Sequence, residues 1–421
     1  MEVSVTSQAL AAVKKPRKFR LTWPIVLGGV VALILLLSIT RVVSGANDIT
    51  SGGTMAAMLA AAVPIGLAGL GGLWSERSGV VNIGLEGMMI LGTWFGAWGA
   101  VTWGPWMGIL LGAIGGAIGA VLHAVATVTF GVDHVVSGVA INILGFGAAK
   151  YLAAAVFADL PGGGDTQSPR LPSPGTFSIP GIGEPLRSLE QTHIFFLSDL
   201  AGVLRGLTQN VSWFTLLAVL MVPLTWWVLW RTAFGLRLRS CGESPTAAES
   251  LGVNVYYYKY VAVIVSGVMA GLGGAFLSLV AAGIYREGQT GGRGYIGLAT
   301  LIFGNYRPGG LAGGALLFGY TDSLQLRQGG TSVHALLFTL SLLVVGAAVY
   351  LLVKRHRNVP ALITAVAGVL VFWLYQVTDS VPEQFTTATP YIVTLLVLAL
   401  ASQRLRPPAA DGLPYRRGQG H

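Results

Sequence analysis

The chain is patterned as long apolar runs separated by shorter polar segments. The first run, Trp23–Val43, has 21 residues. As an α-helix it would be about 31 Å long, because each residue adds about 1.5 Å. The hydrocarbon core of a bilayer is about 30 Å thick. The pattern therefore predicts that this run crosses a membrane as a helix.

Further apolar runs follow along the chain. They cover Thr54–Leu73, Val80–Val101, Trp106–Phe130, Val135–Phe157, Val211–Trp230, Tyr260–Gly283, Leu311–Leu326, His334–Val353, Ala361–Val377 and Thr389–Ser402. A shorter stretch, Gly294–Phe303, has the length of half a span, so Gly294–Leu326 forms either two spans or a re-entrant hairpin. We expect an all-α integral membrane protein with about 10–12 transmembrane helices.

Composition excludes a soluble protein. Hydrophobic residues make up 53% of the chain, charged residues 10%, and the mean hydropathy is +0.68, whereas a soluble domain is about a quarter charged. The 59 glycines include many within the apolar runs, where each would cost a helix in water about 1 kcal/mol. Membrane helices tolerate these glycines because small residues let their backbones pack closely.

The basic residues predict how the chain is oriented. If the N-terminus is inside and the spans alternate, 18 of the 26 Lys and Arg residues fall on inner segments, 7 on outer segments and Lys150 within a span. This positive-inside bias places both termini on the cytoplasmic side of the cell membrane. Because the charges lie between apolar spans and not on one face of a folded domain, we expect no nucleic-acid partner.

The same interpretation divides the chain into segments. We expect a basic cytoplasmic tail (1–22), a transmembrane domain (23–353), additional C-terminal transmembrane helices (354–402) and a cytoplasmic tail (403–421). Within the domain, residues 158–210 form a proline-rich external loop, whose part Phe195–Leu207 fits a short helix on the outer surface. This loop either docks an external solute-receptor protein or covers the helix ends.

One short sequence recurs in a way that bears on mechanism. AGLGG occurs at Ala68–Gly72 and again at Ala270–Gly274, and IGL follows each copy, at Ile83–Leu85 and Ile296–Leu298. In the alternating topology the two copies lie on spans that run in opposite directions. This arrangement predicts an inverted-topology repeat, the architecture of alternating-access transporters with a solute site near the repeat interface.

Nothing in the sequence indicates an enzyme. GxxxxGK[ST], HExxH and GxSxG do not occur, and the carboxylates are scattered. Cys241 is the single cysteine, so it can form neither an internal disulfide nor a CxxC metal pair. We expect no catalytic residue, no metal and no cofactor.

Polar residues within the apolar runs are the candidates for a translocation path. Glu86 is the clearest, because a charge at the middle of a membrane helix costs a few kcal/mol unless it is paired or hydrated. Asn82 lies four residues earlier and shares its helix face. The pair either lines the path or makes a structural hydrogen bond, and Arg77 near the inner end favours the structural role. Weaker candidates are His123, Asn142, Lys150 and Asp322.

The only long inner loop, residues 231–259, contains a second candidate. Ser244 suits a helix N-cap, Pro245 the first helical position and Gly252 the left-handed position after the helix. The sequence therefore predicts a helix of about two turns. A helix this short is marginal alone in water, so a partner or the membrane-helix ends must hold it.

Three stretches resemble the permeases of branched-chain amino acid, simple-sugar and nucleoside ATP-binding cassette (ABC) importers. They are WSERSGVVNIGLEGMMILG (74–92), GESPTAAESLGV (242–253) and GGRGYIGLATLIFGNYRPGGLAGGALLFG (291–319), which stand in the order found in that family. The first and third look most like nucleoside permeases and their simple-sugar relatives. The resemblance does not cover the N-terminal tail or the spans beyond about Val353.

The resemblance implies that ATP is hydrolysed in partner subunits and that the short inner helix is the coupling helix that contacts them. The residues of this coupling segment are Gly242, Glu243, Ser244, Pro245, Ala247, Ala248, Glu249 and Gly252. It further implies cytoplasmic ATP-binding subunits, a second permease chain, identical or different, and an extracellular solute-binding protein. Nucleosides are the implied solute, with simple sugars next.

The alternative function is an ion-coupled secondary transporter of small polar solutes. Such a transporter would also have inverted repeats, and would use Glu86, His123 or Asp322 as its coupling group. It leaves the short inner helix unexplained.

Overall fold

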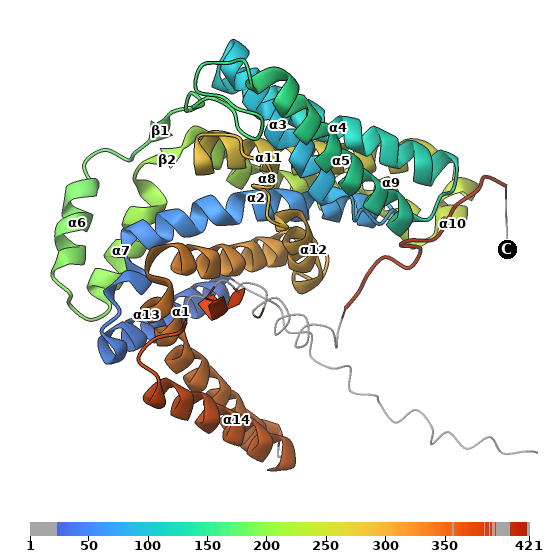
Figure 1. Cartoon of the computed structure of the whole chain (residues 1–421). Coiled ribbons are helices and arrows are strands. Elements are labelled where there is room, and N and C mark those ends of the chain that lie inside the picture. Colours follow the sequence, from blue (N-terminus) through green and yellow to red (C-terminus); the bar gives the residue numbers. More distant parts are fainter. Residues whose placement is uncertain are drawn as a thin grey trace, which may run out of the picture.

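The computed structural model of the chain describes residues 23–355, 358–382, 384–386, 388–389, 392 and 405–418. The molecule is built almost entirely from helices (Figure 1). The helices are α1 (Trp23–Ser44), α2 (Gly52–Arg77), α3 (Leu85–Trp103), α4 (Pro105–Ala124), α5 (His134–Phe157), α6 (Gly183–Gln191), α7 (Leu197–Thr208), α8 (Trp213–Arg231), α9 (Ala233–Glu243), α10 (Pro245–Ser250), α11 (Val255–Phe276), α12 (Arg293–Phe303), α13 (Pro308–Arg355) and α14 (Asn358–Val377). Shorter elements are η1 (Asn47–Thr50), η2 (Val125–Thr129), η3 (Leu277–Ala282), β1 (Thr176–Phe177) and β2 (Val211–Ser212).

Eight helices within the described part of the chain are long and apolar enough to cross a membrane. They confirm the predicted all-α integral membrane fold. α3, with 19 residues, has the length of a span but is not among these eight helices. The predicted span Thr389–Ser402 lies almost entirely outside the described residues.

Two predicted spans, Leu311–Leu326 and His334–Val353, belong to one helix of 48 residues, α13. The polar residues between them predicted a break. However, polar side chains do not interrupt the backbone hydrogen bonds of a helix, and this stretch contains no proline. A straight helix of this length would measure about 72 Å, more than twice the bilayer core. Only its second part, Gly329–Lys354, qualifies as a span.

The predicted span Val80–Val101 also begins later than expected, at Leu85. Between α2 and α3 the chain makes a non-helical turn, in which Gly79 has a φ of +84°. The Ser75 hydroxyl donates a hydrogen bond of 2.6 Å to the carbonyl of Val80 and holds this turn. The apolar residues of the turn hid it in the sequence, because hydropathy alone does not distinguish a buried turn from a helix.

The centre of the molecule is a close packing of α2, α3, α4 and α11. Glycine makes this possible, because a Cβ added to Gly116 of α4 would overlap the carbonyl oxygen of Gly267 in α11. A Cβ added to Gly92 of α3 would likewise overlap Gly271 of α11. The AGLGG sequence of α11 therefore lies at a crossing where only small residues fit.

The two AGLGG helices, α2 and α11, pack against each other and run in opposite directions. The C-terminal end of α2 and the N-terminal end of α11 lie at the same end of the molecule, where Lys259 bonds the carbonyl of Gly79 at 3.4 Å. Their antiparallel arrangement agrees with the alternating topology. The internal repeat itself stays a prediction.

The helix α12 has 11 residues, about half the length needed to cross a bilayer. It ends near Tyr306, whose backbone carbonyl accepts a hydrogen bond of 2.7 Å from Arg77 at the end of α2. The chain then turns and α13 runs back, with Gly304 and Gly310 in close backbone contact. Gly294–Leu326 is thus a hairpin with one short arm, as expected for a re-entrant segment.

Residues 158–210 and the segment with α10 lie at opposite ends of the molecule (Figure 1). We call these the α6 end and the α10 end. Residues 405–418 also lie at the α10 end, where Ala410 bonds the carbonyl of Gly242 at 2.9 Å. The predicted loop helix Phe195–Leu207 is observed as α7.

The last part of α13 and α14 form a hairpin that projects from the rest of the molecule (Figure 1). His334 of α13 and Tyr375 of α14 stack with ring centroids 4.7 Å apart, and α14 packs principally against α13. Most of the apolar side chains of α14 are exposed, which is expected of a helix surrounded by lipid. This hairpin contains the helix predicted as an addition beyond residue 353.

Candidate functional site

The predicted short inner helix is present as α10, which has 6 residues. Pro245 stands at its first position as predicted, and Gly252 has a left-handed φ of +81°. Ser244 occupies the N-cap position, although its side chain makes no capping hydrogen bond. α9 and α10 together form an elbow between the long helices α8 and α11.

The residues of the coupling segment face in two directions. Ala248 is buried within the chain's own core, in one cluster with Trp74 and Val255, so it is not available to another subunit. By contrast, the side chain of Leu251 is 84% exposed. Ala247 and Ser250 are exposed beside it. A leucine this exposed at a polar helix end is a suitable anchor for a partner protein.

Polar contacts fix the ends of the coupling segment. Glu243 lies 3.9 Å from Arg77 of α2, and the Tyr415 hydroxyl donates a hydrogen bond of 2.6 Å to Glu249. Gly242 packs so closely on the end of α2 that a Cβ there would overlap the carbonyl of Arg77. The coupling segment is therefore fastened to α2, the central helix of the bundle.

The second candidate, Glu86, lies at the start of α3 and faces the start of α12. Its two carboxylate oxygens accept hydrogen bonds from the backbone N–H groups of Gly292 at 2.9 Å and Gly294 at 2.7 Å. A carboxylate at this position satisfies free N–H groups and complements the positive end of the helix dipole. Glu86 is 7% exposed. These contacts support the structural role for Glu86.

Asn82 lies in the turn before α3 and is fully buried. Its amide donates a hydrogen bond of 2.9 Å to Ser266 of α11, and its carbonyl oxygen accepts one of 3.0 Å from the backbone of Gly84. Asn82 and Glu86 therefore do not share a helix face, because α3 begins between them. Asn82 joins the turn to α11, whereas Glu86 joins α3 to α12.

Asn142 of α5, a weaker candidate in the sequence, is central to the site. Its carbonyl oxygen accepts a hydrogen bond of 2.7 Å from the backbone of Gly87, and its amide donates one of 2.9 Å to the Tyr295 hydroxyl. Tyr295 is 47% exposed. We call Glu86, Asn142 and Tyr295 the polar junction, because they join α3, α5 and α12. Tyr295 was missed in the sequence, although it directly follows the GGRG stretch that begins α12.

The remaining polar candidates have separate partners. His123 is buried and interacts with the Ser137 hydroxyl at 2.8 Å. Lys150 forms a partly exposed ion pair with Glu287 at 3.4 Å, and Asp322 pairs with Arg293 at 2.8 Å. Within the described part of the chain, none of these three side chains bonds to Glu86, Asn142 or Tyr295. Within that part of the chain, no group of three or more His, Cys, Asp or Glu side chains could hold a metal ion.

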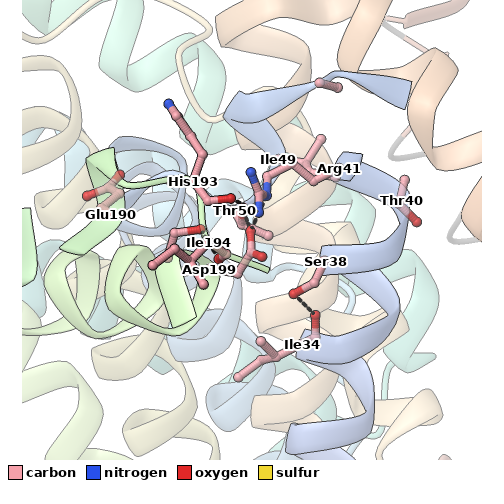
Figure 2. A network of polar contacts seen from close by, with 12 residues as sticks. Ile34, Ser38, Thr40, Arg41, Ile49, Thr50, Glu190, His193, Ile194 and Asp199 are labelled. Atoms are coloured by element: carbon pink, nitrogen blue, oxygen red, sulfur yellow. Dashed lines mark hydrogen bonds and ion pairs between the residues drawn. The ribbon is translucent and has the colours of Figure 1, made fainter. Parts of the chain in front are cut away.

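A separate polar network lies at the α6 end (Figure 2). Arg41 of α1 and Asp199 of α7 form a buried ion pair of 2.7 Å, and the Thr50 hydroxyl donates to the same carboxylate. Glu190 of α6 accepts a hydrogen bond of 2.9 Å from the backbone of Gly52 and pairs with Arg205. The network ties residues 158–210 to α1 and to the start of α2. Its residues are far apart along the chain, so no local pattern could predict it.

The same residues line a cavity of about 380 Å³. Its wall carries both signs of charge, with Arg41, Asp48, Arg187 and Asp199 among the lining residues. Most of these charges are already paired within the chain, which makes the cavity a polar recess at the α6 end.

Comparison with known proteins agrees with this architecture. A profile of the family described as "Branched-chain amino acid transport system / permease component" matches residues 54–353. The chain is 32% identical over 371 residues to the guanosine ABC transporter permease protein NupQ of Bacillus subtilis, covering 86% of this chain and 96% of that protein. It is 34% identical over 371 residues to the nucleoside ABC transporter permease protein NupC of Lactococcus lactis, covering 86% and 96%.

A third relative has a different named solute. The chain is 34% identical over 372 residues to a protein of Haloferax volcanii whose name assigns it to glucose transport as an ABC permease, covering 87% of this chain and 98% of that protein. No solved structure matches the chain significantly.

Proposed function

Because the chain belongs to the family of branched-chain amino acid transport system permease components, we propose that it forms the membrane path of an ABC importer for nucleosides. The observation that carries this proposal is similarity along nearly the whole length of two permeases named for guanosine and nucleoside transport. The chain is a multi-pass membrane protein of the plasma membrane. Its relatives are transporter subunits, and proteins of this kind work with ATP-binding and solute-binding partners.

The coupling segment is the proposed contact with the ATP-binding subunits. Its support is an exposed leucine, Leu251, in a segment that also contacts α2 through the ion pair between Glu243 and Arg77. A force applied at Leu251 would reach α2. It would then reach α11, because the two helices pack so closely that a Cβ added to Gly71 of α2 would overlap the carbonyl oxygen of Ser266 in α11. Closure of the ATP-binding subunits would then move packed helices as rigid bodies, which is how alternating access works in transporters.

The polar junction marks the proposed edge of the translocation path. Glu86 has both carboxylate oxygens engaged by backbone groups, so its proposed role is to hold the start of α12 in place. Tyr295 is more exposed than Glu86, and half-helix ends of this kind surround solute sites in transporters. Asn82 supports the turn beside it. In this proposal Tyr295, not Glu86, contacts the solute.

The proposed orientation has both termini and α10 in the cytoplasm and the α6 end outside. Its support is the Lys and Arg bias together with the opposite placement of α6 and α10 (Figure 1). In this orientation the solute-binding protein docks at the α6 end. A second permease chain, identical or different, would complete the path beside α5, which has an exposed apolar face that includes Val136 and Ile143.

Two alternatives remain to be separated by experiment. Simple sugars are the second solute class, since one relative is named for glucose transport. An ion-coupled transporter would need a titratable group in the path. However, Glu86 and Asp322 are engaged by backbone groups and by Arg293, respectively.

The test is ATP hydrolysis by the assembled complex. The chain would be purified with its ATP-binding and solute-binding proteins, and hydrolysis measured with guanosine, other nucleosides, glucose and ribose. Stimulation by nucleosides alone supports the proposal. Stimulation by sugars alone would reassign the solute class, and the absence of any stable complex with an ATP-binding subunit would contradict the importer function.

A further inference from the structure

Between η3 and α12 the chain runs without helical structure through residues 283–292, which we call the descending segment. Its first half is bonded to residues 158–210, because the backbone N–H of Glu287 donates to the carbonyl of Thr166 at 2.8 Å. The backbone N–H of its last residue donates to the carboxylate of Glu86 at 2.9 Å. The segment therefore runs from the α6 end to the polar junction.

The descending segment follows α5 on this course. Glu287 pairs with Lys150 of α5 at 3.4 Å, and after the segment the Tyr295 hydroxyl accepts a bond of 2.9 Å from Asn142 of α5. Lys150 and Asn142 are eight residues apart, or about 12 Å along the helix. Lys150 itself stands seven residues before the end of α5 at Phe157, or about 10 Å. Because α5 is long enough to span the membrane, the descending segment lies at the depth of the hydrocarbon.

The backbone of the descending segment is accessible at this depth. Gly288 and Gly291 are exposed, and both have a positive φ, of 74° and 53°. Irregular backbone has unpaired polar groups, so within a membrane it occurs only where it is buried in protein or lines a water-filled cavity. The exposed glycines exclude burial within this chain. The segment therefore faces a space that holds water and not lipid.

Lys150 leads to the same conclusion from a different element. Its side chain is 62% exposed, on a face of α5 that also carries Ile143 and Gly147. A charge that faces lipid is costly, and a lysine in that position extends its amine towards the membrane surface. Here the amine lies beside the carboxylate of Glu287, which is on a shorter side chain and cannot extend as far. The pair needs water, so this face of α5 contacts it.

We propose that Lys150 and Glu287 line the outer half of the solute path and balance each other's charge there, so that the path favours uncharged solutes over anions and cations. The inference rests on the proposed function in taking the exposed face of α5 as one wall of the path. When both side chains are present, their fields cancel for a solute that passes them. Either one alone would attract solutes of the opposite charge. Nucleosides and simple sugars pass this criterion equally, whereas solutes that carry a phosphate or carboxylate group do not.

Other charged groups around the pair are constant in the variants that test it. Arg293 at the start of α12 is paired with Asp322 at 2.8 Å. Arg286 is exposed at the outer end of the descending segment, where its backbone bridges Gln167. Substitutions at positions 150 and 287 therefore change the charge of the path against a fixed background.

The test uses two thiol reagents of opposite charge. Gly147→Cys places a thiol one turn from Lys150, at a position where an added Cβ meets no atom within 4 Å. Val369→Cys places a thiol near the middle of α14, where the side chain is 61% exposed and faces lipid. The native Cys241 is buried and contributes little labelling. Cells that contain the complete transporter and maintain ATP would be treated with a negatively and a positively charged methanethiosulfonate, neither of which crosses membranes.

We expect Gly147→Cys to react and Val369→Cys not to react, because a thiol ionises in water and not in hydrocarbon. Glu287→Gln leaves Lys150 unpaired, so at Gly147→Cys the ratio of the negative to the positive reagent's rate should rise about three- to tenfold, as one charge at about 6 Å in water requires. Lys150→Met should lower that ratio by a similar factor, and the double variant should restore it. Glu184→Gln, which neutralises an exposed carboxylate on α6, should leave the ratio unchanged.

Two results would overturn the proposal. A Gly147→Cys thiol that reacts in detergent but not in cells would show that this face of α5 does not contact water. A ratio that neither Glu287→Gln nor Lys150→Met changes would show that the pair does not set the charge of the path. If Gly147→Cys does not accumulate, Ile143→Cys takes its place, since Ile143 is 71% exposed on the same face.

These rates report on the wall of the path and not on the solute or its energy source. Uptake of glucose in place of guanosine, or uptake without ATP, would revise the proposed function and leave the labelling result intact. An unchanged ratio of rates together with ATP-dependent uptake of guanosine would remove the charge pair and leave the importer function standing.

Discussion

At the scale of single residues, the structure identifies the partners of Glu86. The sequence presents a lone acid within an apolar run, for which lining a path and making a structural bond are both reasonable roles. The contacts show that both of its oxygens accept backbone N–H groups at the start of α12. These partners lie more than 200 residues away in the sequence, so no local pattern could identify them.

Glu86→Gln should therefore reduce stability. An amide has one oxygen, so one of the N–H groups of Gly292 and Gly294 would lose its acceptor, at a cost of about 1–3 kcal/mol. We expect a lower midpoint of thermal unfolding in detergent and less protein in the membrane. Glu287→Gln, which removes only a partly exposed partner of Lys150, should cost no more than about 1 kcal/mol and serves as the control. Normal accumulation with lost transport would instead show that Glu86 lines the path.

At the scale of helices and turns, the sequence was most informative where one physical signal dominates. Apolar length located α1, α2, α4, α5 and α8 within a few residues, because burial in lipid requires about 20 apolar residues. Apolar length did not predict the turn before α3, because the residues of that turn are themselves apolar. It also predicted a break within α13, where polar residues occur in an unbroken helix. Turn chemistry at Pro245 and Gly252 correctly located α10.

The side of α10 that faces a partner could not be predicted from sequence. Ala248 is a natural choice for a contact residue, but the fold turns it into the core of the chain. A charge at Ala248 would therefore disrupt this chain before it affected any interface. The exposed residue is Leu251, which the pattern gave no reason to single out.

Leu251→Asp should weaken binding of the ATP-binding subunit while leaving the permease folded. The side chain is 84% exposed, so the substitution costs the isolated chain little, whereas burying an aspartate in an apolar pocket costs the complex several kcal/mol. We expect loss of co-purification with an unchanged unfolding midpoint. Leu251→Met keeps an apolar side chain and should bind normally. Intact binding by Leu251→Asp would remove this residue from the interface.

Helix packing offers a second test with a matched pair of glycines. Gly116→Ala adds a methyl group that would overlap the carbonyl of Gly267, whereas Gly147 on α5 has no atom near the position of an added Cβ. Gly116→Ala should destabilise the bundle by about 1–3 kcal/mol. Gly147→Ala should be neutral or slightly stabilising. Thermal unfolding in detergent measures both, and equal midpoints for the two variants would contradict the close packing of α4 on α11.

At the scale of the whole molecule, orientation links the fold to function. The α6 end and the α10 end can serve different partners only if they lie on opposite sides of the membrane. Glu184 on α6 and Ser250 on α10 are both exposed, and the native Cys241 is buried. These positions therefore suit cysteine labelling.

A membrane-impermeant maleimide applied to intact cells should label Glu184→Cys and not Ser250→Cys. Permeabilised cells should show labelling of both variants, which controls for accessibility. The reverse pattern would place α10 outside and would exclude it from contact with cytoplasmic ATP-binding subunits.

The central claim is that this chain carries nucleosides with energy from ATP. The most direct measurement is uptake of radiolabelled guanosine into proteoliposomes that hold the permease, its ATP-binding subunits and the solute-binding protein. We predict uptake that requires ATP on the side of α10, persists when ionophores remove all ion gradients, and is not reduced by excess glucose. Uptake that continues without ATP and stops with the ion gradient would contradict the account and identify an ion-coupled transporter.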